Sequence, residues 1–226
     1  MKYLVSIMGH ARTGSNYLCK LIEESFKDVE SQYELFNRKT CHLNETSKQK
    51  VCAHFKLDTE KLSDISHKDP IDFLNTIIEL TDKSVFSHKV FPEHLDFSEA
   101  LKIVDKSDFL FIVKRNFIDV YISKKRAIKM MESYDNPWVS IDTTGYKIDF
   151  DRDEYLQQEY IFNEWYIKLL EYIEKKNKLF SIIDYSHFHS LSVTNQQDLI
   201  KSELGRKIPK CYLSITDDVS LLNKQD

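Results

Sequence analysis

Glycine and proline are scarce in this sequence, with four of each among 226 residues, and no repeat or low-complexity tract is present. These residues dominate linkers between domains, so their scarcity leaves no obvious domain boundary. With 42% hydrophobic residues the chain is also able to bury a full core. We therefore expect one domain spanning residues 1–226.

The sequence also lacks an excess of positive charge. Its net charge is -4 and its isoelectric point is near 6.1. General nucleic-acid binders need a basic surface to hold the phosphate backbone, so this composition argues against such a partner. Any basic site must therefore be local.

The sequence contains neither the cysteine spacing of a zinc site nor the long apolar run of a membrane span. The four cysteines are scattered without the paired spacing of zinc ligands. No apolar run approaches the length that crosses a bilayer, and the N-terminal residues are predicted to form a strand rather than a signal segment. We expect reduced thiols, no metal and a cytoplasmic protein.

The most informative stretch lies at the start of the chain. Residues 3–8 form a short apolar run, residues 9–16 contain two glycines, and apolar residues then recur at helical spacing. This pattern predicts a strand, a loop and a helix. Gly9 and Gly14 are five residues apart, as in phosphate-binding loops, where glycine lets several backbone N–H groups approach one anion.

The loop differs from that of nucleoside triphosphate enzymes at two positions. Ser15 stands where a lysine would follow the second glycine, and Asn16 stands where a hydroxyl residue would hold magnesium. A triphosphate with its metal is therefore a poor ligand, whereas a single 5'-phosphoryl group would still find N–H groups at a helix N-terminus. The side chains available to it are those of Arg12, Thr13 and Ser15.

A second group of phosphate-binding side chains is predicted around residue 115. Residues 109–113 are a continuous apolar run, typical of a strand buried on both faces of a parallel sheet. Arg115 follows at its end, and Ser123 lies about two turns into the next predicted helix. A guanidinium and a hydroxyl so placed can bind one dianionic phosphate. The alternative is a strand-end arginine and a helix serine without any ligand.

Both segments resemble motifs of the sulfotransferases. Residues 11–18 (Ala-Arg-Thr-Gly-Ser-Asn-Tyr-Leu) are similar to the Pro-Arg-Ser-Gly-Ser-Thr-x-Leu loop of that family, and residues 115–123 to its Arg-Asn-Pro-x-Asp-x-x-x-Ser segment. The resemblance implies a P-loop-like α/β fold and metal-independent transfer of a sulfuryl group from 3'-phosphoadenosine 5'-phosphosulfate to a hydroxyl or amine. The donor-binding residues that it implies are Arg12, Thr13, Gly14, Ser15, Asn16, Arg115 and Ser123.

The same resemblance implies a set of catalytic residues. Glu34 lies in a Glu-x-Phe segment like that at the acceptor site of bacterial and of lipid- or sugar-directed sulfotransferases. We expect it to be the base, with partial burial raising its pKa. Lys89 matches a strand lysine of the family, and Lys89 and Arg12 are expected to stabilise charge on the leaving group. Three histidines are rival bases: His42, His54 and His88.

Strands alternate with helices along the chain, which predicts a parallel sheet covered on both faces, because parallel neighbours need helical crossovers. The sequence is therefore assigned to the α/β class. Besides residues 3–8 and 109–113, the predicted strands are 29–37, 84–91 and 179–185.

Four further helices are predicted. Pro70 favours the first turn of one, and another follows residue 115 with Ile118, Ile122 and Ala127 on its apolar side. A long helix over 153–176 has an apolar stripe that includes Leu156 and Tyr160 and is expected to be core. The last helix spans 193–204 and ends at Gly205.

Two other functions remain open from the sequence. One is a P-loop kinase or another nucleotide-binding protein, and the other is a non-catalytic module that binds the donor alone. The acceptor is also open among a carbohydrate, a glycolipid, a small metabolite and a peptide tyrosine. Residues 38–69 are expected to form acceptor-side loops and short helices. Residues 132–151 are expected to form a loop over the donor or acceptor pocket, with a plain surface loop as the alternative.

Overall fold

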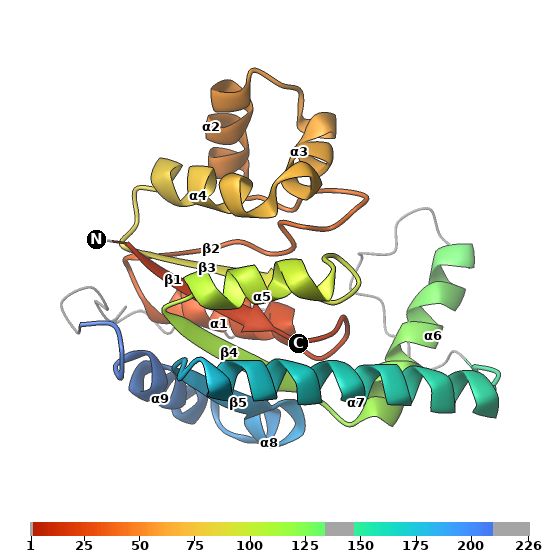
Figure 1. The fold of residues 1–226 in the computed structure, drawn as a ribbon. Helices are drawn as coiled ribbons and strands as arrows, with labels where there is room; N and C mark the ends of the chain where they lie inside the picture. Colours follow the sequence, from red (N-terminus) through yellow and green to blue (C-terminus); the bar gives the residue numbers. More distant parts are fainter. Residues whose placement is uncertain (1, 134–146, 210–226) are drawn as a thin grey trace.

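A parallel β-sheet of five strands forms the centre of the computed structural model, which describes residues 2–133 and 147–209 (Figure 1). The strand order is β2-β3-β1-β4-β5, and every neighbouring pair is parallel. The predicted α/β class with a parallel sheet is therefore confirmed. The strands are β1 (Tyr3–Met8), β2 (Val29–Ser31), β3 (Val85–Val90), β4 (Phe109–Lys114) and β5 (Phe180–Asp184).

Helices cover both faces of this sheet (Figure 1). Side chains of α1, α8 and α9 pack on one face, and side chains of α4, α5 and α7 pack on the other. The helices are α1 (Ser15–Ser25), α2 (Glu45–Phe55), α3 (Leu62–Lys68), α4 (Pro70–Leu80), α5 (Phe97–Lys106), α6 (Phe117–Ser133), α7 (Arg152–Lys175), α8 (Tyr185–Ser190) and α9 (Val193–Leu204), with a 3-10 turn at Thr59–Lys61.

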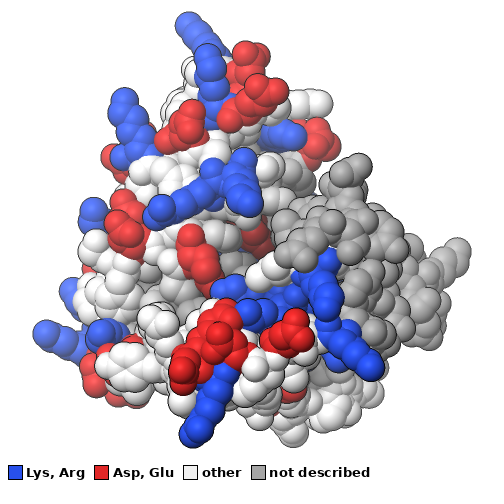
Figure 2. Space-filling view, turned by 90° about the vertical axis from the view of Figure 1, so that its right-hand side faces the viewer, with Lys and Arg blue, Asp and Glu red and all other residues white. Residues whose placement is uncertain are grey.

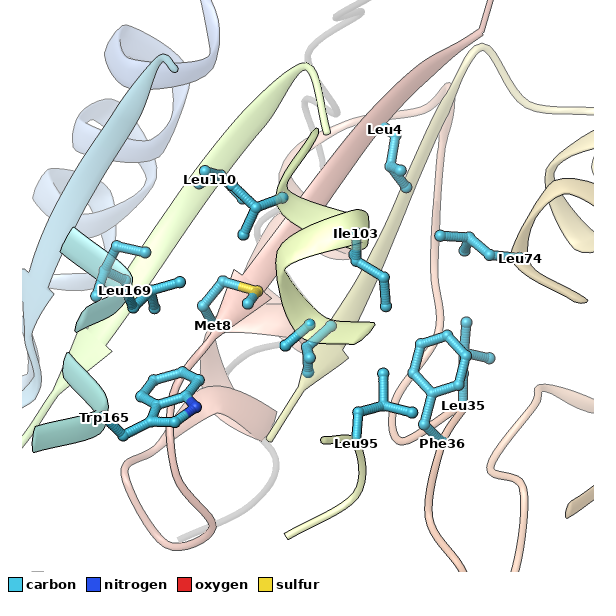
Figure 3. Close-up of a cluster of buried hydrophobic side chains, with 14 of the residues drawn as sticks. Leu4, Met8, Leu35, Phe36, Leu74, Leu95, Ile103, Leu110, Trp165 and Leu169 are labelled. Carbon is cyan, nitrogen blue, oxygen red and sulfur yellow. The ribbon is translucent and has the colours of Figure 1, made fainter. Parts of the chain in front are cut away.

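Successive residues of β1 belong to two different cores. Leu4 and Met8 lie in the cluster on the α4, α5 and α7 side, whereas Val5 and Ile7 lie in the cluster on the α1, α8 and α9 side. A strand turns alternate side chains to opposite faces, so a sheet covered on both faces needs apolar residues at nearly every position. Figure 3 shows the first cluster, where side chains from the sheet, α5 and α7 gather in one layer.

The carboxyl ends of the inner strands meet at one edge of the sheet. Met8 of β1 pairs with Val90 of β3 and with Ile112 of β4. The chain leaves β1 toward α1 and β2, but leaves β4 toward α6 and β5 on the opposite side. In open α/β sheets, ligands bind beyond the strand ends where two connections diverge in this way. The residues that follow β1 and β4 therefore occupy the position expected for a binding site.

Several local sequence signals account for where the helices begin and end. Pro70 is in the first turn of α4, and Asp69 caps that helix by accepting a hydrogen bond from the N–H of Asp72. The predicted helices 153–176 and 193–204 are observed as α7 and α9. Gly205 follows α9 as expected, although its φ of -62° is accessible to any residue.

Some predictions about extent and burial are wrong. The second strand ends at Ser31 rather than at residue 37, and turns follow it. In α6 the buried residues include Phe117, Val120 and Tyr121, because these side chains face α7 and the sheet. The residues predicted as the apolar side of α6 are only partly buried: Ile118, Ile122 and Ala127.

The start of α7 also differs from the prediction. Leu156 is 47% exposed and Tyr160 is 67% exposed, although the helical spacing placed both in the apolar stripe. Both lie on the face of α7 that is turned away from Phe162 and the core, as does Ile167, which is 51% exposed. The later part of the stripe is buried as predicted, with Phe162, Trp165 and Leu169 in the core.

Residues 38–69 form short helices and loops as expected, whereas α5 and α8 were not predicted. Residues 134–146, which make up most of the predicted loop at 132–151, lie outside the described residues. Across the described ranges, none of the helices combines the length and the apolar character that a membrane crossing requires. Cys19, Cys41 and Cys52 are free, and burial raises the pKa of Cys19 to about 11 and that of Cys41 to about 12.

Candidate active site

A cavity of about 360 Å³ lies beyond the carboxyl edge of the sheet, and each of the five strands is followed by a residue that lines it. It brings together all the residues predicted to bind the donor or to act in catalysis except Thr13 and Lys89. We call this space the donor cavity. Its lining residues are Ala11, Arg12, Gly14, Ser15, Asn16, Glu34, Asn37, Phe91, His94, Arg115, Ser123 and Tyr185.

The loop after β1 has an unusual backbone at two positions. Gly14 has a φ of +90° and Arg12 has a φ of 70°, both in the left-handed region. Glycine adopts this region freely, whereas arginine does so rarely, and such outliers concentrate at functional sites. The conformation turns the chain sharply between the end of β1 and the start of α1.

Helix α1 begins at the cavity without a side-chain cap. Within residues 2–133 and 147–209, no side chain accepts a hydrogen bond from its first turn, and no acidic residue lies in that turn. The first N–H groups of a helix have no partner within the helix, and the helix dipole places partial positive charge there. With Ser15 and Asn16 both lining the cavity, this N-terminus is suited to an anion.

Two arginines lie next to each other beside this helix end. The Nη1 group of Arg115 donates to the carbonyl oxygen of Arg12 at 3.2 Å, and the Nε group of Arg12 donates to the Oγ of Ser123 at 3.0 Å. Burial and the charge of Arg115 together lower the pKa of Arg12. Two guanidinium groups repel each other in this position, and an anion between them would remove the repulsion.

Arg115 also has an unused donor. Its Nε group is buried and has no hydrogen-bond partner among the described residues, and a buried donor without an acceptor is costly. The guanidinium carbon lies 4.9 Å from the centre of the Tyr185 ring, so the group is held over an aromatic face. The arrangement fixes Arg115, and the bond to Arg12 uses only one of the five N–H donors of the guanidinium.

Thr13 does not contribute its hydroxyl to the cavity. The side chain is fully buried, and its Oγ1 donates to the carbonyl oxygen of His10 at 2.7 Å. The sequence led us to expect this hydroxyl at a phosphate, so the structure corrects that expectation. The bond instead ties the loop back onto the end of β1.

Glu34 lies at the wall of the donor cavity, and its pKa shift is opposite in direction to the one expected. Its Oε1 accepts from Lys89 Nζ at 3.2 Å, and its Oε2 accepts from Asn37 Nδ2 at 2.8 Å. Burial raises the pKa of Glu34, but the Lys89 ammonium, the Asn37 hydrogen bond and nearby His94 outweigh burial and leave this pKa below its ordinary value. Glu34 is therefore an ionised carboxylate at neutral pH.

Lys89 lies behind the cavity wall rather than on it. Its side chain is completely buried, and its ammonium donates to Asn16 Oδ1 and to Glu34 Oε1. It also lies 5.0 Å from the centre of the Phe91 ring. This differs from the direct contact with a leaving group that we expected, because Asn16 and Glu34 stand between the ammonium and the cavity. Lys89 holds these two residues in place.

The histidines named as rival bases do not line the cavity. His88, the strongest of them, is fully buried on the opposite face of β3 from Lys89, with Nε2 2.8 Å from the Oγ of Ser6. Burial lowers its pKa to about 3. His54 is exposed on α2. His88 is therefore a core residue and not a base for this cavity.

Sequence reasoning missed His94 as a catalytic candidate. Its Nε2 lies 3.7 Å from Glu34 Oε2, and its Nδ1 is buried with no hydrogen-bond partner in the described part of the chain. Burial lowers the pKa of His94 more than the Glu34 carboxylate raises it, so the ring is neutral at pH 7. The sequence shows that His94 closely follows the predicted strand 84–91. It does not show that the His94 side chain points toward Glu34.

Charge on this side of the molecule is mixed. Figure 2 shows the side toward which the strands run, where lysines and arginines are interspersed with carboxylates and no large area has one sign. The positive charge of Arg12 and Arg115 is therefore local to the cavity, as the overall composition required. Within the described ranges, no group of three or more His, Cys, Asp or Glu side chains is arranged to hold a metal ion.

Comparison with models of known protein families and with curated protein sequences finds no match for this chain. The fold is that of an α/β protein with a parallel sheet, and the site is a cavity lined by Arg12, Arg115 and the start of α1, with the ionisable pair Glu34 and His94 in its wall.

Proposed function

We propose that this protein is a sulfotransferase that moves a sulfuryl group from 3'-phosphoadenosine 5'-phosphosulfate to a hydroxyl or amine of an acceptor. The observation that carries the proposal is the pairing of Arg12 and Arg115 at the uncapped start of α1, where both side chains line the donor cavity. A ligand with two separate anionic groups satisfies this arrangement better than a ligand with one. The donor has such groups at its 5' and 3' positions.

In this proposal the 5'-phosphosulfate lies against the start of α1, and the 3'-phosphate lies against Arg115 and Ser123. Gly14 permits the close approach of the backbone, and the N–H groups of the first turn bind the phosphate oxygens. Arg12 contacts Ser123 at 3.0 Å, so its guanidinium is within reach of both anionic groups. The proposed 5' residues are Arg12, Gly14, Ser15 and Asn16.

The chemical step exchanges one bond to sulfur for another. The acceptor oxygen or nitrogen forms a bond to sulfur while the bond between sulfur and the bridging oxygen breaks. The electron pair of that bond stays on the bridging oxygen of the departing 3',5'-bisphosphate, where Arg12 and the start of α1 stabilise the charge. The acceptor proton passes to the carboxylate of Glu34.

Lys89 serves this step as a positioning residue. Its ammonium bonds both Glu34 and Asn16, so it links the proposed base to the donor loop. It also keeps Glu34 ionised, which means that the base is ready to accept a proton at neutral pH. A carboxylate held in this way is a weaker base than a free one, and the neutral ring of His94 at 3.7 Å is the group that could share the proton.

Titration calorimetry tests the donor site. The protein should bind 3'-phosphoadenosine 5'-phosphate, and magnesium should not improve its binding of ATP, because Ser15 and Asn16 replace the lysine and the metal-binding hydroxyl of a kinase loop. Tighter binding of ATP with magnesium than of the bisphosphate would favour the kinase alternative.

Turnover with a panel of acceptors and labelled donor tests the chemistry. Sulfuryl transfer should continue in EDTA, since the proposed step needs no metal. Loss of turnover in EDTA with recovery in magnesium would contradict the proposal. Binding of the bisphosphate with no transfer to any acceptor class would favour the non-catalytic module.

A further inference from the structure

Helix α7 runs along the outside of the molecule and carries apolar residues on two sides (Figure 1). On the inner side, Phe162 and Leu169 are buried in the core. On the outer side, Leu156, Tyr160 and Ile167 are 47%, 67% and 51% exposed. A surface helix normally turns polar residues away from the core. The outer side of α7 therefore has the composition of a surface that packs against another apolar surface.

The outer residues follow the spacing by which two helices pair. Leu156, Tyr160, Asn163, Ile167 and Leu170 are separated by steps of four, three, four and three positions. This alternation is the repeat with which two α-helices pack side by side. Leu170 is partly buried, and the other four side chains are exposed. We call these five residues the outer seam, which is about 21 Å long at the helical rise per residue.

Asn163 is the polar member of the outer seam. Its amide has donors and an acceptor, so it can bond an identical amide on a second helix. In paired helices, a single asparagine at such a position fixes the register of the two partners. A lipid surface would instead leave this amide without a partner in an apolar environment. Asn163 therefore favours a second helix as the occupant of the seam.

The charges along α7 indicate which helix fits. Residues 151–160 contain four carboxylates and one arginine, whereas residues 167–178 contain four lysines and two carboxylates. Two copies of α7 packed antiparallel place the acidic end of each beside the basic end of the other. A two-fold axis produces this arrangement with the same surface on both copies. A second copy of this chain thus provides an apolar seam, a matching asparagine and complementary charge.

We propose that the protein forms a homodimer in which the outer seams of two α7 helices pack antiparallel about a two-fold axis. The five seam residues do not line the donor cavity, so each copy keeps its own site and the dimer does not depend on the proposed sulfotransferase function. Pairing also explains Leu156 and Tyr160, whose helical spacing predicts burial although a single copy leaves them exposed.

Sedimentation velocity tests the dimer. The wild-type protein at micromolar concentration should have a mass near twice that of the 26.8 kDa chain. Ile167→Glu places a charge in the seam and should weaken association by at least about tenfold, which lowers the mass toward that of the monomer. A wild-type protein that stays monomeric throughout the accessible concentration range would overturn the proposal.

Ile161→Glu is the matched control. Ile161 also lies on α7 and is 56% exposed, but six residues at about 100° each place it about 120° around the helix from Ile167. This variant should dimerise like the wild type. Circular dichroism and urea denaturation should show that both variants fold, since both substitutions change exposed residues. Equal loss of the dimer in the two variants, or loss in neither, would overturn the proposal.

Chemical cross-linking tests the antiparallel arrangement. Leu156→Cys and Leu170→Cys are treated with a short bis-maleimide separately and as a mixture, and the wild-type protein gives the background from the native cysteines. Antiparallel packing places residue 156 beside residue 170 of the other copy and about 21 Å from residue 156 of that copy. The mixture should therefore give more cross-linked dimer than either variant alone. Stronger cross-linking of each variant with itself would show a parallel pair and overturn the proposal.

Discussion

Tyr185 lies directly over Gly14, so that a Cβ added to this glycine would be 2.0 Å from the Cε2 atom of the tyrosine ring. The ring is itself stacked on His189, with centres 5.4 Å apart, and carries the Arg115 guanidinium on its face. The first residues after β5 therefore close over the loop that follows β1. Position 14 therefore requires glycine for two reasons. Its φ lies in the left-handed region, and a side chain there would clash with the Tyr185 ring.

Substitution of Gly14 should damage stability and ligand binding together. Gly14→Ala places a side chain in the left-handed region, at a cost of about 1–2 kcal/mol, and also forces the Tyr185 ring to move. Chemical denaturation and bisphosphate titration measure the two effects. The double substitution Gly14→Ala with Tyr185→Ala removes the clash and should recover part of the lost stability. Wild-type stability in the single variant would contradict this account.

Arg115→Ala should weaken binding of the 3',5'-bisphosphate by about 2 kcal/mol or more, because a charged hydrogen-bond partner is lost. Binding of adenosine 5'-phosphate, which has no 3'-phosphate, should barely change. Arg206→Ala is the control, since Arg206 is paired with Glu203 on the surface and does not line the donor cavity. Equal losses for both nucleotides would show that Arg115 acts only by holding the Arg12 carbonyl.

Glu34→Gln should lower sulfuryl transfer by at least about 100-fold while donor affinity holds, because the substitution keeps the shape and removes the base. Steady-state rates together with bisphosphate titration separate the two quantities. His88→Gln should retain turnover, since His88 lies in the core. If Glu34→Gln stays within a few-fold of wild type and His94→Asn is inactive, the base is His94 instead.

Acid should destabilise the protein through His88. Burial lowers the pKa of His88 from 6.5 to about 3, so in that interval the unfolded chain binds a proton that the folded protein does not. The free energy of unfolding should therefore rise with pH through this interval, with a contribution of about 1.4 kcal/mol per pH unit from this residue.

Urea denaturation at several pH values between 4.5 and 6.5 measures this slope. His88→Gln should reduce it, since glutamine can still bond Ser6 but does not titrate. His54→Gln changes an exposed histidine and should leave the slope as in wild type. Identical slopes for all three proteins would show that His88 is not the group responsible.

Local sequence patterns were enough to predict the five strands and to place Arg12 and Arg115 after two of them. The apolar runs of β1 and β4 specify strands buried on both faces, and parallel strands bring their carboxyl ends to one edge. Arg12 and Arg115 each follow such a strand, so their proximity is a consequence of the sheet. Local patterns also decided α7 and α9, because helical spacing and end signals act over only a few residues.

The tertiary structure alone decided which side chains reach the cavity. Thr13 and Lys89 carry the right chemistry but are turned inward, whereas His94 and Tyr185 reach the cavity without any motif that predicts it. It also reversed the expected direction of the Glu34 pKa shift. The physical reason is that hydrogen bonds and charges at this site join residues from five different strand ends, and their geometry depends on packing between segments far apart in the chain.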